Sequence, residues 1–255
     1  MSMSVSNGTA RTSGKLIAIT GVSRGLGRAL VDEFIRRGHR LVGCARSPSA
    51  INELQHTYPT HQFATVDVSS DSEVQRWAGF VIARCGPPDL VLNNAAQFHQ
   101  RNLIWETSAR DFNEVLGTNV RGVANTIRHF APVMTARRAG VFVNFISRWG
   151  LQTDSSMAAY CASKWAVVAL SRVAAAELHG YGVTSVALNP GTVRTEMLDR
   201  YLRNGHQHAE PSSAPTPKAW AREAATCILG FGLQDSGNVR CVNATAFDRE
   251  EEVSV

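Results

Sequence analysis

The chain carries the stretch LIAITGVSRGLG at residues 16–27, from which the fold class can be inferred. Its first five residues are apolar or β-branched, as in a strand buried on both faces of a sheet. Glycines follow at Gly21, Gly25 and Gly27, and an apolar helical face begins at Leu26. Gly21 permits a tight turn, Gly25 a close backbone approach to a ligand, and Gly27 close packing of helix on strand. The stretch predicts a strand–turn–helix unit whose helix N-terminus binds phosphate.

The glycine spacing, G-x3-G-x-G, differs from the common dinucleotide-binding pattern G-x-G-x-x-G. A flexible turn without a ligand is the alternative for such a motif considered alone. The position of the motif between a predicted strand and a predicted helix favours a dinucleotide site.

The rest of the chain alternates between apolar, strand-like runs and helical stretches. This alternation predicts an α/β fold of Rossmann type, a doubly wound parallel sheet of about seven strands with helices on both faces. The expected strands lie at residues 16–20, 41–45, 63–68, 90–93, 141–146, 183–188 and 239–243.

Composition and charge argue against several other classes of protein. The 255 residues are 44% hydrophobic and 18% charged, as in folded globular proteins, and contain no apolar run of the roughly 20 residues that span a membrane. The net charge is +5, but the basic residues are spread singly and are not interleaved with aromatic residues. We therefore expect a ligand with several phosphates, and neither a nucleic-acid nor a membrane partner.

Cysteine and histidine spacing indicates neither disulfides nor a metal. Five scattered cysteines without a secretion signal predict reduced thiols and a cytoplasmic location. His206 and His208 have no third ligand at a suitable spacing, so no metal site is expected.

The end of the second predicted strand indicates which dinucleotide is bound. NAD sites carry an acidic residue about 20 residues beyond the glycines, on the ribose 2′-hydroxyl. Here the strand ends at Arg46, and Arg24 lies in the glycine turn. Two guanidinium groups suit a 2′-phosphate, which predicts NADP(H); two solvated surface charges are the alternative.

A second group of residues has the spacing of a catalytic site. Ser147 follows the fifth predicted strand, Tyr160 comes thirteen residues later, and Lys164 follows Tyr160 by one helical turn. With Asn119 and the glycine turn in this order, the chain resembles the short-chain dehydrogenase/reductase family in its common single-domain form. The resemblance covers nearly the whole chain and also rests on Asn93-Asn94-Ala95-Ala96 and on Pro190-Gly191 followed by Thr195.

These residue types suit hydride transfer between NADP(H) and a carbonyl or alcohol substrate. A free phenol has a pKa of about 10, and a nearby ammonium favours phenolate, so Lys164 would help Tyr160 act as the acid–base group. Ser147 would orient the substrate oxygen. The resemblance implies that Asn119 anchors a water linking Lys164 to solvent, which completes the predicted catalytic set.

The resemblance also implies contacts to the cofactor. Asp67 and Val68 would line the adenine pocket, although a turn or helix-capping acid is the alternative for Asp67, and Thr195 would meet the carboxamide. The predicted cofactor set comprises Gly21, Ser23, Arg24, Gly25, Leu26, Gly27, Arg46, Asp67, Val68, Asn94, Ala95, Tyr160, Lys164, Pro190, Gly191, Val193 and Thr195.

The expected organisation is a single NADP(H)-binding catalytic domain at residues 15–246. Residues 1–14 are expected to form a flexible tail and residues 247–255 an acidic C-terminal tail. The poorly patterned segment at about residues 192–217 predicts a substrate lid, with a disordered surface excursion as the alternative.

The favoured function is reduction of an aldehyde or ketone, a small-molecule substrate, by a homodimer or homotetramer. A catalytically idle NADP(H)-binding sensor or scaffold is the main alternative, and the intact catalytic set argues against it. The loops at residues 98–99 and 148–149 should face the substrate with aromatic side chains, although each of these residues alone is more typical of packing.

Overall fold

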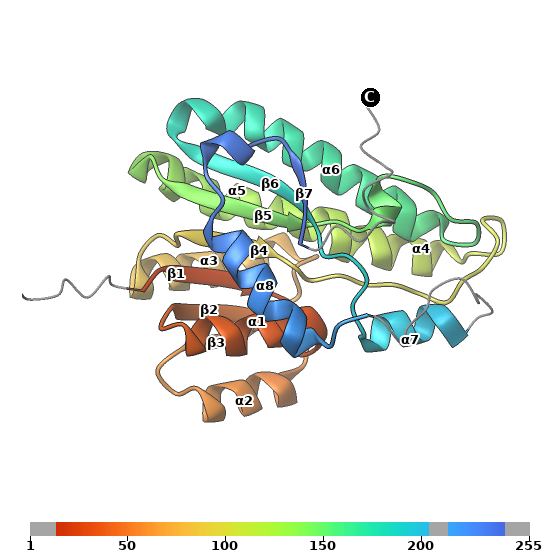
Figure 1. Cartoon of the computed structure of the whole chain (residues 1–255), viewed down its shortest axis with the longest axis horizontal. Coiled ribbons are helices and arrows are strands. Elements are labelled where there is room, and N and C mark those ends of the chain that lie inside the picture. Colours follow the sequence, from red (N-terminus) through yellow and green to blue (C-terminus); the bar gives the residue numbers. More distant parts are fainter. Residues whose placement is uncertain (1–13, 204–213, 243–255) are drawn as a thin grey trace, which may run out of the picture.

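A parallel sheet flanked by two layers of helices forms the body of the protein (Figure 1). The computed structural model describes residues 14–203 and 214–242. Within these residues the sheet has seven strands in the order β3-β2-β1-β4-β5-β6-β7, all parallel. The predicted Rossmann-type fold class is therefore confirmed. The strands are β1 (Leu16–Thr20), β2 (Arg40–Ala45), β3 (Gln62–Thr65), β4 (Leu90–Asn93), β5 (Gly140–Phe145), β6 (Val183–Asn189) and β7 (Val239–Cys241).

Both faces of the sheet are covered by helices, which explains the continuously apolar strand sequences. In β1 the side chains of Ile17 and Ile19 enter one buried cluster, and those of Leu16 and Ala18 enter another on the opposite face. The first cluster includes α1 (Gly25–Arg36), α2 (Pro48–Thr57) and α8 (Pro217–Leu229). The second includes α3 (Asp71–Cys85), α5 (Gly122–Arg137) and α6 (Ala158–Leu178), while α4 (Ala109–Leu116) contacts α6.

The third strand is shorter than predicted. It ends at Thr65, because Asp67 turns the chain: its Oδ1 accepts hydrogen bonds from the backbone N–H of Ser69 at 2.9 Å and from the Ser69 hydroxyl at 2.8 Å. The Asp67 carbonyl also accepts from the N–H of Ser70. Side-chain bonds of this kind compete with a sheet ladder, so the strand gives way to a turn.

Several predicted features lie outside the described residues. They are residues 1–13 of the N-terminal tail, the whole C-terminal tail, the pair His206 and His208, and the central part of the predicted lid at residues 204–213. The beginning of the lid is described and contains the helix α7 (Glu196–Arg203). No described helix has the length and apolarity needed to cross a membrane.

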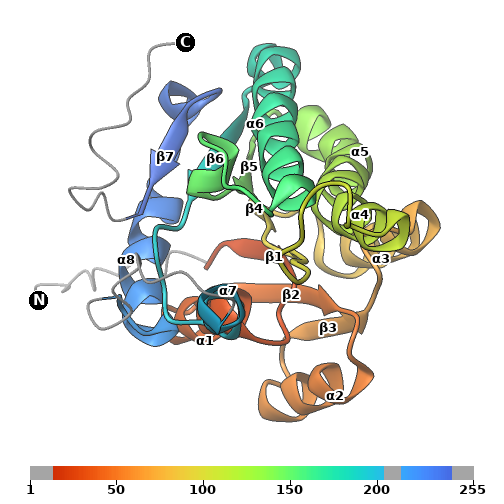
Figure 2. The same cartoon turned by 90° about the vertical axis from the view of Figure 1, so that its right-hand side faces the viewer.

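The topology determines where a ligand can bind. The chain reverses its direction of winding between β1 and β4, which are neighbours in the sheet. Loops that leave the carboxyl ends of these strands run to opposite faces and leave a crevice between them. Figure 2 shows α7 near the N-terminal end of α1, at this edge of the sheet.

Candidate active site

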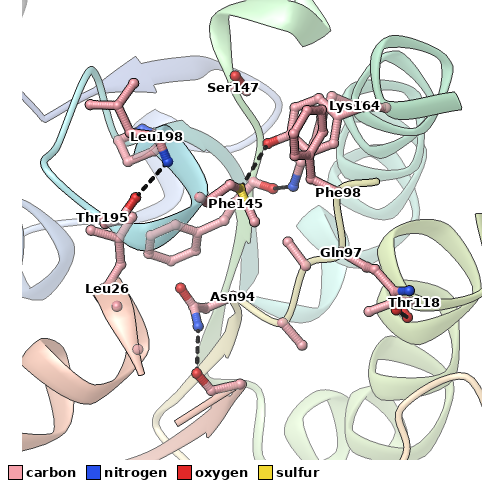
Figure 3. Close-up of a pocket in the computed structure, with 18 of the residues that line it drawn as sticks. Leu26, Asn94, Gln97, Phe98, Thr118, Phe145, Ser147, Lys164, Thr195 and Leu198 are labelled. Atoms are coloured by element: carbon pink, nitrogen blue, oxygen red, sulfur yellow. Dashed lines mark hydrogen bonds between the residues drawn. The ribbon is translucent and has the colours of Figure 1, made fainter. Parts of the chain in front are cut away.

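A cavity of about 1100 Å³ extends along the carboxyl ends of the strands. Its wall begins at the glycine turn after β1 and passes the loops after β4 and β5 to Tyr160 on α6, with α7 over part of it (Figure 3). The cavity thus joins the predicted cofactor end and the predicted catalytic end in one space.

The glycine turn has the backbone conformation that its sequence predicts. Gly21 and Gly25 have φ values of 76° and 58°, in the left-handed region that favours glycine. A Cβ on Gly21 would lie 2.7 Å from the Cα of Ala95, so the turn touches the loop after β4. For a Cβ on Gly25 the nearest atom belongs to Thr195 at 4.0 Å, which leaves space for a ligand. Asn94 joins the two loops, since its Nδ2 donates to the Gly21 carbonyl at 3.1 Å.

The two predicted 2′-phosphate partners line the same end of the cavity. Arg46 follows β2 directly and is exposed. Arg24 precedes α1, and its Nη1 lies 2.8 Å from Oε2 of Glu196, the first residue of α7. Both side chains of this ion pair are mostly exposed, so the pair contributes little to stability.

The predicted catalytic side chains meet at the other end. Ser147 follows β5, and its hydroxyl lies near that of Tyr160, where it acts to lower the pKa of the tyrosine. The Tyr160 hydroxyl itself donates to Sδ of Met197 at 4.0 Å. Lys164 lies one turn further along α6, and its Nζ donates a hydrogen bond of 2.8 Å to the carbonyl of Phe145 (Figure 3). The Nζ atom is 5.6 Å from the centre of the Tyr160 ring. All three side chains line the cavity.

Burial shifts the pKa values of the acid–base pair in opposite directions. Desolvation raises the pKa of Tyr160 to about 12, and the neighbouring Ser147 side chain only partly opposes this shift. Desolvation also lowers the pKa of Lys164 to about 8. The net lowering of the tyrosine pKa that the sequence analysis expected is not seen, because burial is the largest effect on this group. At neutral pH, Tyr160 is therefore a protonated donor.

The low pKa of Lys164 predicts a particular pH dependence of stability. An unfolded lysine keeps its proton up to about pH 10.5, whereas the folded one loses it near pH 8. Between these values the unfolded state binds more protons, so the protein becomes more stable, relative to a Lys164→Met variant, as pH rises. The change is on the order of 3 kcal/mol over the window. Denaturant unfolding of both proteins at pH 7 to 11 measures this change. Lys218→Met, at an exposed position on α8, is the matched control. If the free energy of unfolding varies with pH in the same way for the wild type and Lys164→Met, the shift is contradicted.

Asn119 lies in a short π-helical turn, η1 (Gly117–Arg121), and does not line the cavity. Its Oδ1 accepts from the N–H of Gln97 at 2.7 Å. Its Nδ2 donates to the Gln97 carbonyl at 3.0 Å and to the hydroxyl of Ser163 at 2.9 Å. Ser163 directly precedes Lys164 on α6, so Asn119 ties the loop after β4 to the helix that carries Tyr160 and Lys164. Its role in anchoring a water stays a prediction.

The remaining predicted cofactor residues line the cavity, with the exception of Asp67. Its carboxylate is used in the turn after β3, which corresponds to the alternative that the sequence left open for this residue. Thr195 follows β6, and its hydroxyl accepts from the N–H of Leu198 at 3.3 Å, at the beginning of α7. Its predicted contact to a carboxamide stays a prediction.

The sequence analysis did not predict every part of the cavity wall. Phe98, His99, Arg148 and Trp149 line the cavity as anticipated, and so does α7 from the predicted lid, but further wall residues come from the segment before α6. Their placement depends on how this segment folds over the site, for which the local sequence carries no clear signal. The missed residues include Gln152, Asp154 and Met157, whereas Met197 and Tyr201 belong to the segment predicted as a substrate lid.

The fold and the site define a Rossmann-type protein of the dinucleotide-binding class. The sequence model of the short chain dehydrogenase family matches residues 15–205, and the chain belongs to this family. The predicted family and its oxidoreductase class are thereby confirmed. In the described residues, no group of three or more His, Cys, Asp or Glu side chains is placed to hold a metal ion.

Similar proteins include enzymes with named activities. The chain is 44% identical to an NADPH-dependent pterin aldehyde reductase of Arabidopsis thaliana, over 88% of this chain and 91% of the relative. Among solved structures, a short-chain dehydrogenase from Streptomyces avermitilis superposes with a TM-score of 0.79 at 26% identity, covering 93% of this chain and 91% of the other. ElxO with NADP bound shares the fold at 24% identity and a TM-score of 0.80, covering 90% of this chain and 97% of the other.

Proposed function

We propose that this protein is an NADP(H)-dependent reductase of aldehydes or ketones, which oxidises the alcohol in the reverse direction. The observation that carries the proposal is the continuity of the cavity from the glycine turn to Ser147 and Tyr160. The name of the Arabidopsis relative, an NADPH-dependent pterin aldehyde reductase, supports NADPH as the cofactor and an aldehyde as the substrate.

The cavity wall fits a dinucleotide with a 2′-phosphate. The backbone N–H groups of the glycine turn lie at the N-terminus of α1, where the helix dipole favours a pyrophosphate. The open space beside Gly25 allows this close approach. Arg46 and Arg24 at the same end would bind the 2′-phosphate, whose geometry suits guanidinium groups.

The catalytic end suits proton donation to a carbonyl oxygen. When bound, the reduced cofactor supplies the hydride. Tyr160, protonated at neutral pH, would donate the proton to the substrate oxygen. Ser147 would hydrogen-bond the same oxygen and orient it. A charged Lys164 would stabilise the phenolate that remains after proton transfer.

The direct test is consumption of NADPH and, separately, of NADH with a panel of aldehydes and ketones that includes pterin-6-carbaldehyde. We expect turnover with NADPH that exceeds turnover with NADH. Cofactor binding without turnover on any carbonyl compound would overturn the proposal and favour an idle sensor of the same fold.

Replacing Arg46 with aspartate should reverse the cofactor preference. The carboxylate would repel a 2′-phosphate and accept a hydrogen bond from a ribose 2′-hydroxyl, as acidic residues at this point of NAD sites do. We expect the ratio of kcat/KM for NADPH to that for NADH to fall by about 10²-fold or more, equivalent to roughly 3 kcal/mol. Arg40→Asp, at the exposed beginning of β2, is the control. An unchanged ratio in Arg46→Asp would show that Arg46 does not contact the 2′-phosphate.

We also propose a homodimer or homotetramer in the cytoplasm. Trp165 and Val173, on α6, are 45% and 53% exposed, which leaves an apolar surface on this helix for a second copy. Free thiols at Cys44, Cys85 and Cys161 suit a reducing compartment. Light scattering of the purified protein measures the assembly, and a monomer at micromolar concentration would contradict it.

A further inference from the structure

The cavity continues beyond Ser147 and Tyr160 into a part that we call the substrate chamber. Its wall contains aromatic rings in well-defined contacts. The rings of Phe98 and Tyr160 meet edge to face with centres 5.6 Å apart, and those of Trp149 and Tyr201 lie 6.2 Å apart. Such walls suit a planar ring. The substrate chamber is defined by Phe98, Trp149, Gln152, Met157, Met197 and Tyr201.

A buried ion pair holds one wall of the substrate chamber in place. Arg101 donates from Nη2 to Oδ1 of Asp154 at 2.8 Å and from Nη1 to Oδ2 at 3.2 Å. The two side chains are only 6% and 11% exposed. The hydroxyl of Tyr201 donates to the same carboxylate at 2.9 Å, and the Arg101 guanidinium lies 5.1 Å from the centre of the Tyr201 ring. Both oxygens of Asp154 are thus engaged within the protein, and this carboxylate serves as a support for the wall.

Gln152 differs from these neighbours because its side-chain amide makes no hydrogen bond to any described residue. The backbone of Gln152 is fixed, since its N–H donates to the Arg148 carbonyl at 2.9 Å and its carbonyl accepts from Nε1 of Trp165 at 3.3 Å. Its Nε2 is buried without a partner although the residue lines the cavity. Buried amides are rarely left unpaired, because the hydrogen bonds lost to water are not replaced. An unpaired amide in the wall of a ligand cavity therefore points to a partner on the ligand.

We propose that the side-chain amide of Gln152 recognises the ring of the substrate. An amide offers a donor and an acceptor side by side. The amide can therefore pair with a ring edge that presents an acceptor and a donor side by side, as the edge of a lactam or of an aminopyrimidine does. The substrate class is then a planar nitrogen heteroaromatic carbonyl compound, held between the aromatic walls with its carbonyl at Tyr160. This inference deepens the proposed function and rests on it for the reaction, but its hydrogen bond is measurable without turnover.

The test compares Gln152→Leu with the wild type in two measurements. The first is binding of pterin, which has a lactam and an aminopyrimidine edge, to the protein saturated with NADP⁺, followed by pterin fluorescence. The second is the ratio of kcat/KM for pterin-6-carbaldehyde to that for 2-naphthaldehyde, a bicyclic aldehyde without ring nitrogen. Leucine has a similar volume and no polar group. A site built to hydrogen-bond its substrate discriminates strongly against an analogue that lacks the partner. We expect pterin affinity and the kcat/KM ratio each to fall at least about 10-fold, with reduction of 2-naphthaldehyde retained.

The controls separate this inference from the proposed function. Gln75→Leu, at an exposed position on α3, should leave both measurements unchanged. Unchanged pterin affinity and an unchanged ratio in Gln152→Leu would overturn the inference while leaving the reductase activity intact. Pterin binding that depends on Gln152 in a protein that reduces no aldehyde would support the inference and overturn the proposed function. Gln152→Met replaces Gln152→Leu if circular dichroism shows that the leucine variant does not fold.

Discussion

Replacing Tyr160 with phenylalanine is expected to lower kcat for aldehyde reduction by roughly 10²- to 10⁴-fold, the usual contribution of a positioned proton donor. The substitution removes only the hydroxyl. The phenyl ring keeps its edge-to-face contact with Phe98 and its buried position, so fold and cavity shape should be preserved. The lost hydroxyl is the group that would donate the proton, and it donates to the Met197 sulfur at 4.0 Å, so affinity for NADPH should stay unchanged.

Initial rates of NADPH oxidation and a fluorescence titration with NADPH measure the two effects. Tyr181→Phe is the matched control, because Tyr181 lies in the short helix η3 (His179–Tyr181) and is 52% exposed. Full activity in Tyr160→Phe would refute the role of Tyr160 as the acid–base group. A parallel loss of NADPH affinity would instead indicate a change in the cavity, and circular dichroism of the variant would identify it.

The elements that could be predicted from the sequence are those governed by local rules. Two glycines adopt positive φ values in the turn that their spacing predicts, and the apolar strands lie within a few residues of their predicted bounds. The one-turn spacing of Tyr160 and Lys164 places both on the cavity side of α6. These features depend on backbone sterics and on helical and strand periodicity, which are encoded over short stretches.

The features that escaped prediction depend on burial and on distant contacts. The direction of the Tyr160 pKa shift follows from desolvation, and the Lys164 ammonium is turned towards the Phe145 carbonyl by the surrounding structure. The support of Tyr201 by Asp154 joins two segments 47 residues apart. No periodicity reveals such a contact, because it forms only when α7 folds back over the cavity. The sequence therefore predicts which single residues could carry the chemistry more readily than it predicts which residues form the wall of the cavity.

Replacing Gly27 with alanine is expected to destabilise the fold and to abolish tight NADPH binding. A Cβ at this position would overlap the backbone carbonyl of Gly21 and the side-chain amide of Asn94. Neither group is free to move, because Asn94 Nδ2 donates to the carbonyls of Thr20 and Gly21. Relief of the overlap requires α1 to move away from the end of β1. Overpacking of this kind costs about 1–3 kcal/mol or more, and it distorts the turn that would bind the pyrophosphate.

Gly79→Ala is the matched control for this substitution. Gly79 lies inside α3, and an added Cβ there would meet no atom within 4 Å. Alanine is the better helix former, so this variant should gain roughly 0.5–1 kcal/mol. Urea unfolding of both variants should therefore show a lower free energy of unfolding for Gly27→Ala and a higher one for Gly79→Ala. NADPH titrations of the same two proteins measure the effect on cofactor binding. A Gly27→Ala protein as stable as the wild type would show that helix α1 does not need its close contact with the glycine turn. The assignment of Gly27 to helix–strand packing would then be wrong, whatever the protein's activity.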